Sequence, residues 1–294
     1  MKRKISALLL VSLVTILLSG YSAPVLAAVT MPTSPKTNAY SSNKVVVDAS
    51  NVGEGYFAIT YTGSNPKIKV QITKSGGTTY SYDLNVRNSF EVFPVSEGNG
   101  TYTVKVFENV SGTSYSQAFS QDISVTLKNE YTPFLYPNQY VNFNQSSNVV
   151  SVAAQVTAGT TDELKKVEAV YNYVVNNFTY DYNKAATVQS GYLPNVDGIL
   201  ASKTGICFDY ASVMAAMLRS QNVPTKLVVG YTGAQYHAWI GVYVKEVGWV
   251  DSAIYFDGTK WNLMDPTFAS TGGSSQSVVE YITNPANYVA KYVY

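Results

Sequence analysis

The stretch that decides the fold is Lys203-Thr-Gly-Ile-Cys207-Phe-Asp-Tyr-Ala-Ser-Val-Met-Ala-Ala-Met-Leu-Arg-Ser-Gln221, which contains the single cysteine of the chain. Apolar residues recur in it at helical spacing, at Ala211, Met214, Ala215 and Leu218. Gly205 gives the chain freedom to turn into this helix, so Cys207 is predicted in or just before the first turn. Free N–H groups and the positive end of the helix dipole stabilise a thiolate there. This is the setting that a nucleophilic cysteine needs.

A thiolate also needs a base, and the sequence offers one histidine, His237. It stands at the start of an aromatic and β-branched run over 238–244, which predicts a strand. Farther on, Asp265 ends a short apolar run and precedes a proline. Cysteine, histidine and aspartate thus follow in the order of a nucleophile, a base and an orienting carboxylate. Asp251 is the alternative third residue, and Asp265 is equally consistent with a turn residue that accepts backbone hydrogen bonds.

The spaced pattern is Gly205-x-Cys207-x-Asp-Tyr-Ala211, a helix ended by Arg219, Gly230-Tyr231, His237-Ala-Trp239, and Trp261 with Asp265-Pro-Thr. Over about 161–268 this set resembles the transglutaminase-like superfamily of cysteine enzymes, most of all secreted bacterial proteins with such a domain. The resemblance implies an α+β, papain-like/transglutaminase-like catalytic domain, in which the helix carrying the cysteine packs on an antiparallel sheet. It also implies a triad of Cys207, His237 and Asp265, because the family's aspartate is commonly followed by proline and threonine.

The same resemblance implies further groups around the site. Family members often have a tyrosine-aspartate pair upstream of the nucleophile, as in Thr179-Tyr-Asp-Tyr182. Tyr180 or Tyr182 is therefore a candidate donor to an oxyanion, and Trp239 a candidate lining residue, with ordinary packing as the alternative. The backbone N–H of Cys207 is the more dependable oxyanion donor, since a helix start presents free N–H groups.

No metal or cofactor is predicted. One cysteine and one histidine cannot build an ordinary zinc site. Asn195-Val-Asp197-Gly198 is a fragment of a calcium loop, but no series of oxygen ligands follows at the right spacing. A glycine-rich phosphate loop is also missing from the sequence.

The first 27 residues are expected to be a secretory signal peptide, cleaved after Ala27 or Ala28. A basic start, Met1-Lys-Arg-Lys4, precedes an apolar run too short to span a bilayer. Export to the extracytoplasmic side follows, either secreted or at the cell surface, with no membrane anchor after cleavage. Removing the three basic residues leaves 17 basic and 19 acidic residues, so neither nucleic acid nor an anionic membrane is predicted as a partner.

The mature chain is long enough for two domains. We expect a flexible lead at 28–42, an all-β sandwich of immunoglobulin or fibronectin type at 43–127, a linker at 128–147 and the transglutaminase-like domain at 148–294. Seven short alternating runs predict the strands of the sandwich, at 45–47, 56–61, 67–73, 79–84, 90–93, 102–107 and 123–127. Helices are predicted over 148–156 and from a hydroxyl cap at Thr161, and an edge strand over 288–294.

The sequence thus predicts an exported cysteine acyl-transfer enzyme that forms a thioester on Cys207. An amine would resolve the thioester in protein cross-linking, and water in a peptidase or amidase reaction; the substrate would be a protein or peptide, with cell-wall peptide among the candidates. The alternative is a non-catalytic surface protein whose sandwich binds a wall polymer or a host protein. The sandwich has no histidine or cysteine, so it is expected to be either a binding module or a spacer. The oligomeric state stays open.

Overall fold

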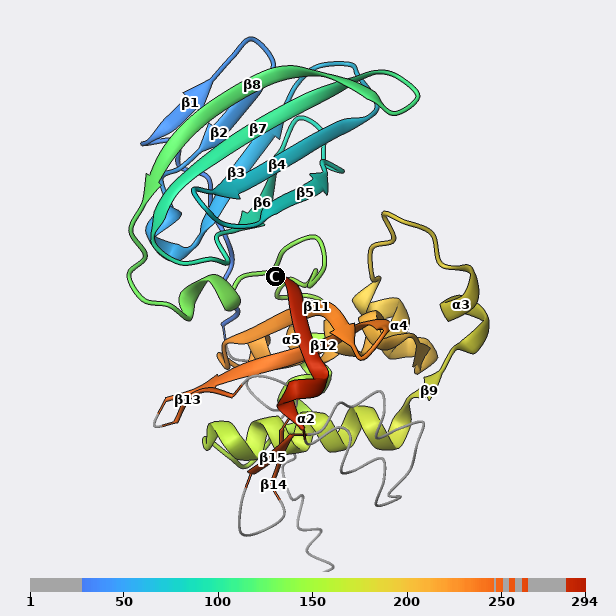
Figure 1. The fold of residues 1–294 in the computed structure, drawn as a ribbon. Coiled ribbons are helices and arrows are strands. Elements are labelled where there is room, and N and C mark those ends of the chain that lie inside the picture. The colour runs from blue at the N-terminus through green and yellow to red at the C-terminus, as the bar shows by residue number, and fades with distance from the viewer. Residues whose placement is uncertain (1–27, 246, 251–253, 257–260, 264–283) are drawn as a thin grey trace, which may run out of the picture.

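The computed structural model describes residues 28–245, 247–250, 254–256, 261–263 and 284–294. Two sheets formed by the N-terminal half lie above a C-terminal part built from helices and further sheets (Figure 1). The predicted signal peptide lies outside the described residues.

The N-terminal sheets are two four-stranded antiparallel sheets. The first has the order β1 (Ala39–Ser41), β2 (Val45–Asp48), β3 (Tyr56–Tyr61) and β6 (Phe90–Pro94). The second has the order β5 (Thr79–Asp83), β4 (Ile68–Lys74), β7 (Gly100–Ser111) and β8 (Ser114–Val125). Each of the seven alternating runs overlaps one of the strands β2 to β8, which confirms the strand pattern, although the runs 67–73, 79–84 and 123–127 extend one or two residues beyond their strands. The assignment to an immunoglobulin-like or fibronectin-like class stays a prediction.

Alternation of side chains builds the core between these sheets. In β4, Ile68, Val70 and Ile72 are buried, whereas the residues between them are partly exposed. Period-two alternation places one face of a strand in the core and the other in water. The three-residue 3₁₀-helix η1 (Val52–Glu54) connects β2 to β3 within the first sheet.

Residues 28–42, which the sequence led us to expect as a flexible lead, lie against the first sheet and supply β1. The Val29 N–H donates to Oε1 of Gln145 at 2.8 Å, and the Thr33 N–H donates to the Tyr56 hydroxyl at 2.9 Å. Asp48, at the end of β2, accepts from the Ser34 hydroxyl and the Lys36 N–H, both at 2.8 Å. Side-chain acceptors far along the chain therefore hold a segment that has no periodic apolar face of its own.

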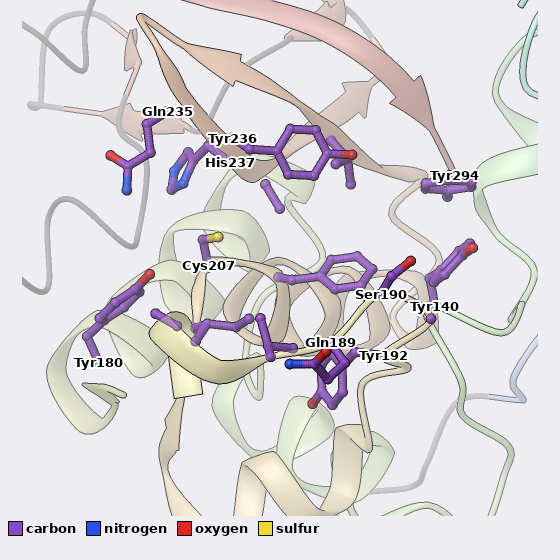
Figure 2. Close-up of a pocket in the computed structure, with 17 residues that line it drawn as sticks. Tyr140, Tyr180, Gln189, Ser190, Tyr192, Cys207, Gln235, Tyr236, His237 and Tyr294 are labelled. Atoms are coloured by element: carbon purple, nitrogen blue, oxygen red, sulfur yellow. The ribbon is translucent and has the colours of Figure 1, made fainter. Parts of the chain in front are cut away.

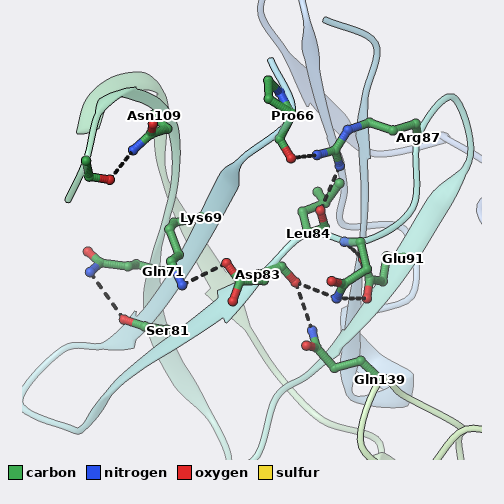
Figure 3. A network of polar contacts seen from close by, with 12 residues as sticks. Pro66, Lys69, Gln71, Ser81, Asp83, Leu84, Arg87, Glu91, Asn109 and Gln139 are labelled. Carbon is green, nitrogen blue, oxygen red and sulfur yellow. Dashed lines mark hydrogen bonds and ion pairs between the residues drawn. The ribbon is translucent and has the colours of Figure 1, made fainter. Parts of the chain in front are cut away.

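The linker is packed as well. The 3₁₀-helix η2 (Thr132–Phe134) begins it, and Phe134, Val141 and Phe143 are buried. Figure 3 shows the polar contacts at the end of β5, where the Asp83 carboxylate is 2.7 Å from Nζ of Lys69. The Asp83 carbonyl accepts from Nε2 of Gln139, 3.4 Å away in the linker. The linker is thus attached to the N-terminal sheets by its side chains as well as by the chain itself.

The C-terminal part is arranged around the helix α5 (Cys207–Ser220), whose residues from Asp209 onward are all buried. The helices around it are α1 (Asn148–Val156), α2 (Glu163–Asn177), α3 (Tyr182–Thr187) and α4 (Val196–Ser202). The main sheet has the order β13 (Gly248–Val250), β12 (Gln235–Val244), β11 (Thr225–Thr232) and β16 (Tyr288–Val293), all antiparallel. Helix α5 packs on β11 and β12, so the expected helix on an antiparallel sheet is confirmed.

Smaller elements complete this part: β9 (Thr179–Tyr180) pairs in parallel with β10 (Thr204–Gly205), β14 (Ile254–Phe256) pairs with β15 (Trp261–Leu263), and η3 (Pro285–Asn287) precedes β16. The predicted helix over 148–156 and the edge strand near the end of the sequence are confirmed as α1 and β16. The predicted cap of α2 is wrong by one residue. Asp162, and not Thr161, accepts from the N–H groups of Leu164 and Lys165.

Arg219, in the last turn of α5, is fully buried. Its Nε donates to the Thr225 carbonyl at 2.9 Å, and its two terminal nitrogens donate to the carbonyls of Tyr136 and Tyr294, each at 2.7 Å. Burial lowers the pKa of this guanidinium. The planar fork of N–H groups lets one side chain reach three carbonyls at fixed angles.

We expect Arg219→Lys to lower the free energy of unfolding by about 3 kcal/mol, because one ammonium cannot replace three bonds in a fork and leaves buried carbonyls unpaired. Urea unfolding followed by circular dichroism measures the change. Lys165→Arg, on the exposed face of α2, is the matched control and should change stability by less than about 0.5 kcal/mol. A stability of Arg219→Lys equal to that of the natural protein would contradict the assigned role.

Asp48 gives a pH-dependent prediction. Burial opposes ionisation of this carboxylate, but hydrogen bonds from Ser50, Ser34 and the Lys36 N–H outweigh that effect and lower its pKa. A lowered folded pKa stabilises the protein above the unfolded value of about 3.9, and this stability is lost as pH falls through the folded pKa.

We therefore expect Asp48→Asn to lose about 1–3 kcal/mol at pH 7, with the difference from the natural protein shrinking below about pH 4. Thermal unfolding at a series of pH values measures this difference. Asp122→Asn, on the exposed edge of β8, serves as the control. A difference between Asp48→Asn and the natural protein that stays constant down to pH 3 would refute the charge-based explanation.

Candidate active site

Cys207 is the first residue of α5 and lines a pocket of about 470 Å³. The extended residue Ile206 precedes it, and the Ile206 N–H donates to Oδ2 of Asp209 at 2.9 Å. A carboxylate three residues into a helix that accepts from the N-cap N–H is half of a capping box. Gly205 makes room for this turn, because a Cβ on it would lie 2.6 Å from the Cβ of Asp209.

His237 reaches the same pocket from the main sheet. It lies on β12 opposite Gly230 of β11, is 4% exposed, and its ring is roughly parallel to that of Trp239. Figure 2 shows the imidazole of His237 above the side chain of Cys207, and both residues line the pocket. The structure therefore brings two of the three predicted triad residues together.

The third predicted residue lies outside the described residues, and so does its alternative. Asp265 follows β15, which ends at Leu263, and Asp251 follows β13, which ends at Val250. The choice between them stays a prediction.

Of the three additional candidates, Tyr180, Tyr182 and Trp239, the structure places one in the lining of the pocket. Tyr180 lines the pocket, since the parallel pairing of β9 with β10 puts Tyr180 beside Gly205, two residues before the cysteine. Tyr182 is 69% exposed and packs edge-on against Tyr180 with centroids 5.0 Å apart, away from the lining. Trp239 is buried behind His237 and contacts the ring of Tyr288. Of the three, Tyr180 alone is a lining residue among those that the structure describes.

Sequence reasoning missed a polar cluster around the carboxylate of Asp209, two residues after the nucleophile. The Asp209 carboxylate is fully buried and accepts from Nζ of Lys184 at 2.5 Å and from the Tyr192 hydroxyl at 2.6 Å. Burial opposes the charge on Lys184, but hydrogen bonds to Asp209 and Tyr192 outweigh it and raise the Lys184 pKa. Burial and the Asp209 carboxylate also raise the pKa of Tyr192. The sequence signal was the Cys-x-Asp spacing, which puts an acid at the N3 position of the helix.

The residues of the calcium-loop fragment, 195–198, bind the N-terminal ends of two helices. Oxygens of Asp197 accept from the N–H groups of Asn148 and Val149 at the start of α1, and Asn195 caps α4. These oxygens are thus already engaged by helix ends. Among the residues that the structure describes, no group of three or more His, Cys, Asp or Glu could hold a metal ion.

The site and the fold together define a class of protein: an α+β domain with a cysteine at a helix start facing a histidine on an antiparallel sheet. Residues 150–266 match the family model of the transglutaminase-like superfamily. Over these residues, which make up less than half of the chain, the protein is similar to that superfamily.

Two curated relatives also match part of the chain. The uncharacterized protein YebA of Bacillus subtilis is 27% identical over 187 residues, which is 55% of this chain and 25% of YebA. The UPF0252 protein MJ1282 of Methanocaldococcus jannaschii is 23% identical over 199 residues, 60% of this chain and 56% of that protein. The chain thus spans less than two thirds of the length of either relative.

Among solved structures, the periplasmic domain of TgpA from Pseudomonas aeruginosa, bound to ethylmercury, is similar with a TM-score of 0.38 and 16% identity, over 78% of this chain and 75% of that one. Across the described part of the chain, no helix combines the length and apolar character needed to cross a membrane.

We expect Lys184→Met to lower the free energy of unfolding by about 2–3 kcal/mol, because the buried Asp209 carboxylate loses its cation. The double variant Lys184→Met with Asp209→Asn should recover part of this loss, since it removes the uncompensated charge. Lys165→Met, an exposed lysine on α2, is the control. Chemical unfolding of the natural protein, Lys184→Met, Asp209→Asn, the double variant and the control measures the coupling, and strictly additive losses of the two single variants would rule it out.

Proposed function

We propose that the protein is an exported cysteine acyl-transfer enzyme of the transglutaminase-like type, acting on protein or peptide substrates. The single observation that carries the proposal is the shared pocket of Cys207 and His237, with the cysteine at the start of a buried helix. Cell-wall peptide is one candidate substrate. Export is supported by the basic and apolar start of the sequence.

The proposed reaction begins when the Cys207 thiolate attacks the carbonyl carbon of an amide. The negative charge moves to the carbonyl oxygen, where the N–H at the start of α5 and the Tyr180 hydroxyl are the proposed donors. The C–N bond then breaks, and the imidazolium of His237 gives its proton to the leaving amine. A thioester on Cys207 remains.

An amine or water completes the cycle. The incoming group loses a proton to His237 as it attacks the thioester carbonyl, and the C–S bond breaks to restore the thiolate. Asp265 is proposed to orient the imidazole through its second nitrogen. With an amine the product is an isopeptide link, and with water it is a free carboxylate.

The first test measures alkylation of the single cysteine. We expect iodoacetamide to alkylate Cys207 at pH 7 faster than an exposed reference thiol, because the helix start and the neighbouring His237 favour the nucleophilic form. His237→Ala should slow this reaction. Intact mass follows the reaction, and Cys207→Ala with Ser114→Cys, an exposed position on β8, provides a reference thiol. A rate equal to or below that of the reference thiol would leave Cys207 as a core residue.

The second measurement is turnover. Dimethylcasein with a fluorescent amine reports transamidation, and ammonia or peptide release without the amine reports hydrolysis. Cys207→Ala should lower either rate by at least about 10³-fold with its circular dichroism unchanged. Undiminished turnover would refute the assignment. An inert thiol together with retention of the protein on purified cell wall would instead favour the non-catalytic surface protein.

A further inference from the structure

The pocket around Cys207 has an unusual lining for a site open to water. Six of its residues carry aromatic rings: Tyr140, Tyr180, Tyr192, Phe208, Tyr236 and Tyr294. Among the described lining residues there is no lysine, arginine, aspartate or glutamate. Apart from the reacting pair Cys207 and His237, the described lining offers no charged side chain to an entering carboxylate or ammonium, which would lose hydration.

The rings are concentrated on one side of the nucleophile. Figure 2 shows Tyr236, Tyr140 and Tyr294 together on one side of Cys207 and Tyr180 on the other. The rings of Tyr140 and Tyr294 are 4.3 Å apart between centroids, and that of Tyr140 is 5.7 Å from Phe208, the residue next to the cysteine. We call the set of Tyr140, Phe208, Tyr236 and Tyr294 the aromatic end of the pocket.

The aromatic end is held in place from two directions. The Ser212 hydroxyl of α5 donates to the Tyr140 carbonyl at 2.5 Å. From the N-terminal sheets, the ring of Tyr82 lies 5.9 Å from Tyr294 and 6.1 Å from Tyr140, and Tyr80 lies 5.8 Å from Tyr294. Because these side chains are already fixed before a ligand binds, binding an aromatic ring does not cost the conformational entropy of ordering the wall.

These rings also stay uncharged. Burial raises the pKa of Tyr140 to about 12, and it raises that of Tyr294 as well. At the mouth, by contrast, apolar surface is open to water: Tyr236 is 52% exposed and Val188 is 37% exposed, although both line the pocket. An apolar occupant would cover this surface.

We propose that the aromatic end binds an uncharged aromatic side chain of the acyl donor, next to the carbonyl that Cys207 attacks. That the bound molecule is an acyl donor rests on the proposed function, whereas the preference for an aromatic group rests on the pocket alone. Aromatic pairs at 4.5–7 Å gain energy beyond the area they bury, and a donor with a carboxylate or ammonium at this position is excluded by desolvation.

The test compares alkylating agents that differ only in the attached group. N-benzyl-iodoacetamide, iodoacetamide and iodoacetyl-glycine are reacted with the full chain, and each rate is divided by the rate with glutathione. We expect the benzyl reagent to be preferred over iodoacetamide by about tenfold, and the carboxylate reagent to be disfavoured. Equal normalised rates for the three reagents would overturn the proposal.

Variants locate the preference. Tyr294→Leu and Tyr236→Ser should each reduce the benzyl preference to about twofold, and Tyr236→Ser changes an exposed ring, so the fold is retained. Tyr115→Leu, on β8 away from the pocket, should keep the full preference. A preference that survives both pocket variants would also overturn the proposal.

Alkylation needs no turnover, so the two proposals fail separately. A benzyl preference in a protein that transfers no acyl group would remove the proposed function and leave the aromatic site. Active acyl transfer with equal normalised rates would remove the aromatic site and leave the function.

Discussion

The buried guanidinium of Arg219 is the interaction on which the C-terminal part depends. Its three acceptors belong to three segments, the start of β11, the linker and the residue after β16. An apolar side chain in its place would leave three carbonyls without a donor in the core. Because α5 is rigid and rises about 1.5 Å per residue, fixing its last turn also fixes Cys207 at the other end.

Asp209 has the corresponding role at the start of α5. It accepts from the Ile206 N–H, from Lys184 of α3 and from Tyr192 of the segment between α3 and α4, so one carboxylate sets both the helix start and a wall of the pocket. A buried carboxylate without a cation would disfavour a second negative charge nearby. Lys184 supplies that cation, which makes the buried acid compatible with a thiolate two residues away.

Local sequence patterns predict several helices and strands of this structure, but they do not predict the contacts between residues that are distant in the chain. Helix α5, the strands β2 to β8 and the placement of His237 on a strand follow from periodicity, which is a property of neighbouring residues. The partners of Asp209 lie 25 and 17 residues upstream, and Gln145 binds Val29 across 116 residues. A local sequence pattern does not encode contacts between residues so far apart in the chain. Residues 28–42 were expected to be a flexible lead for this reason, because distant residues supply the contacts that hold them.

The tyrosines show how the lack of information on distant contacts limits a prediction of function. From the sequence alone, they are equally consistent with packing and with surface recognition. The N-terminal sheets were accordingly expected to be a binding module or a spacer. In the structure Tyr80 and Tyr82 of β5 contact Tyr294, which lines the pocket of Cys207. A change in β5 therefore reaches the pocket through ring contacts and through the Tyr80 hydroxyl, which accepts from the Val293 N–H at 3.3 Å. The N-terminal sheets thus support the pocket wall from outside, because Tyr80 and Tyr82 contact the lining residue Tyr294 without lining the pocket themselves.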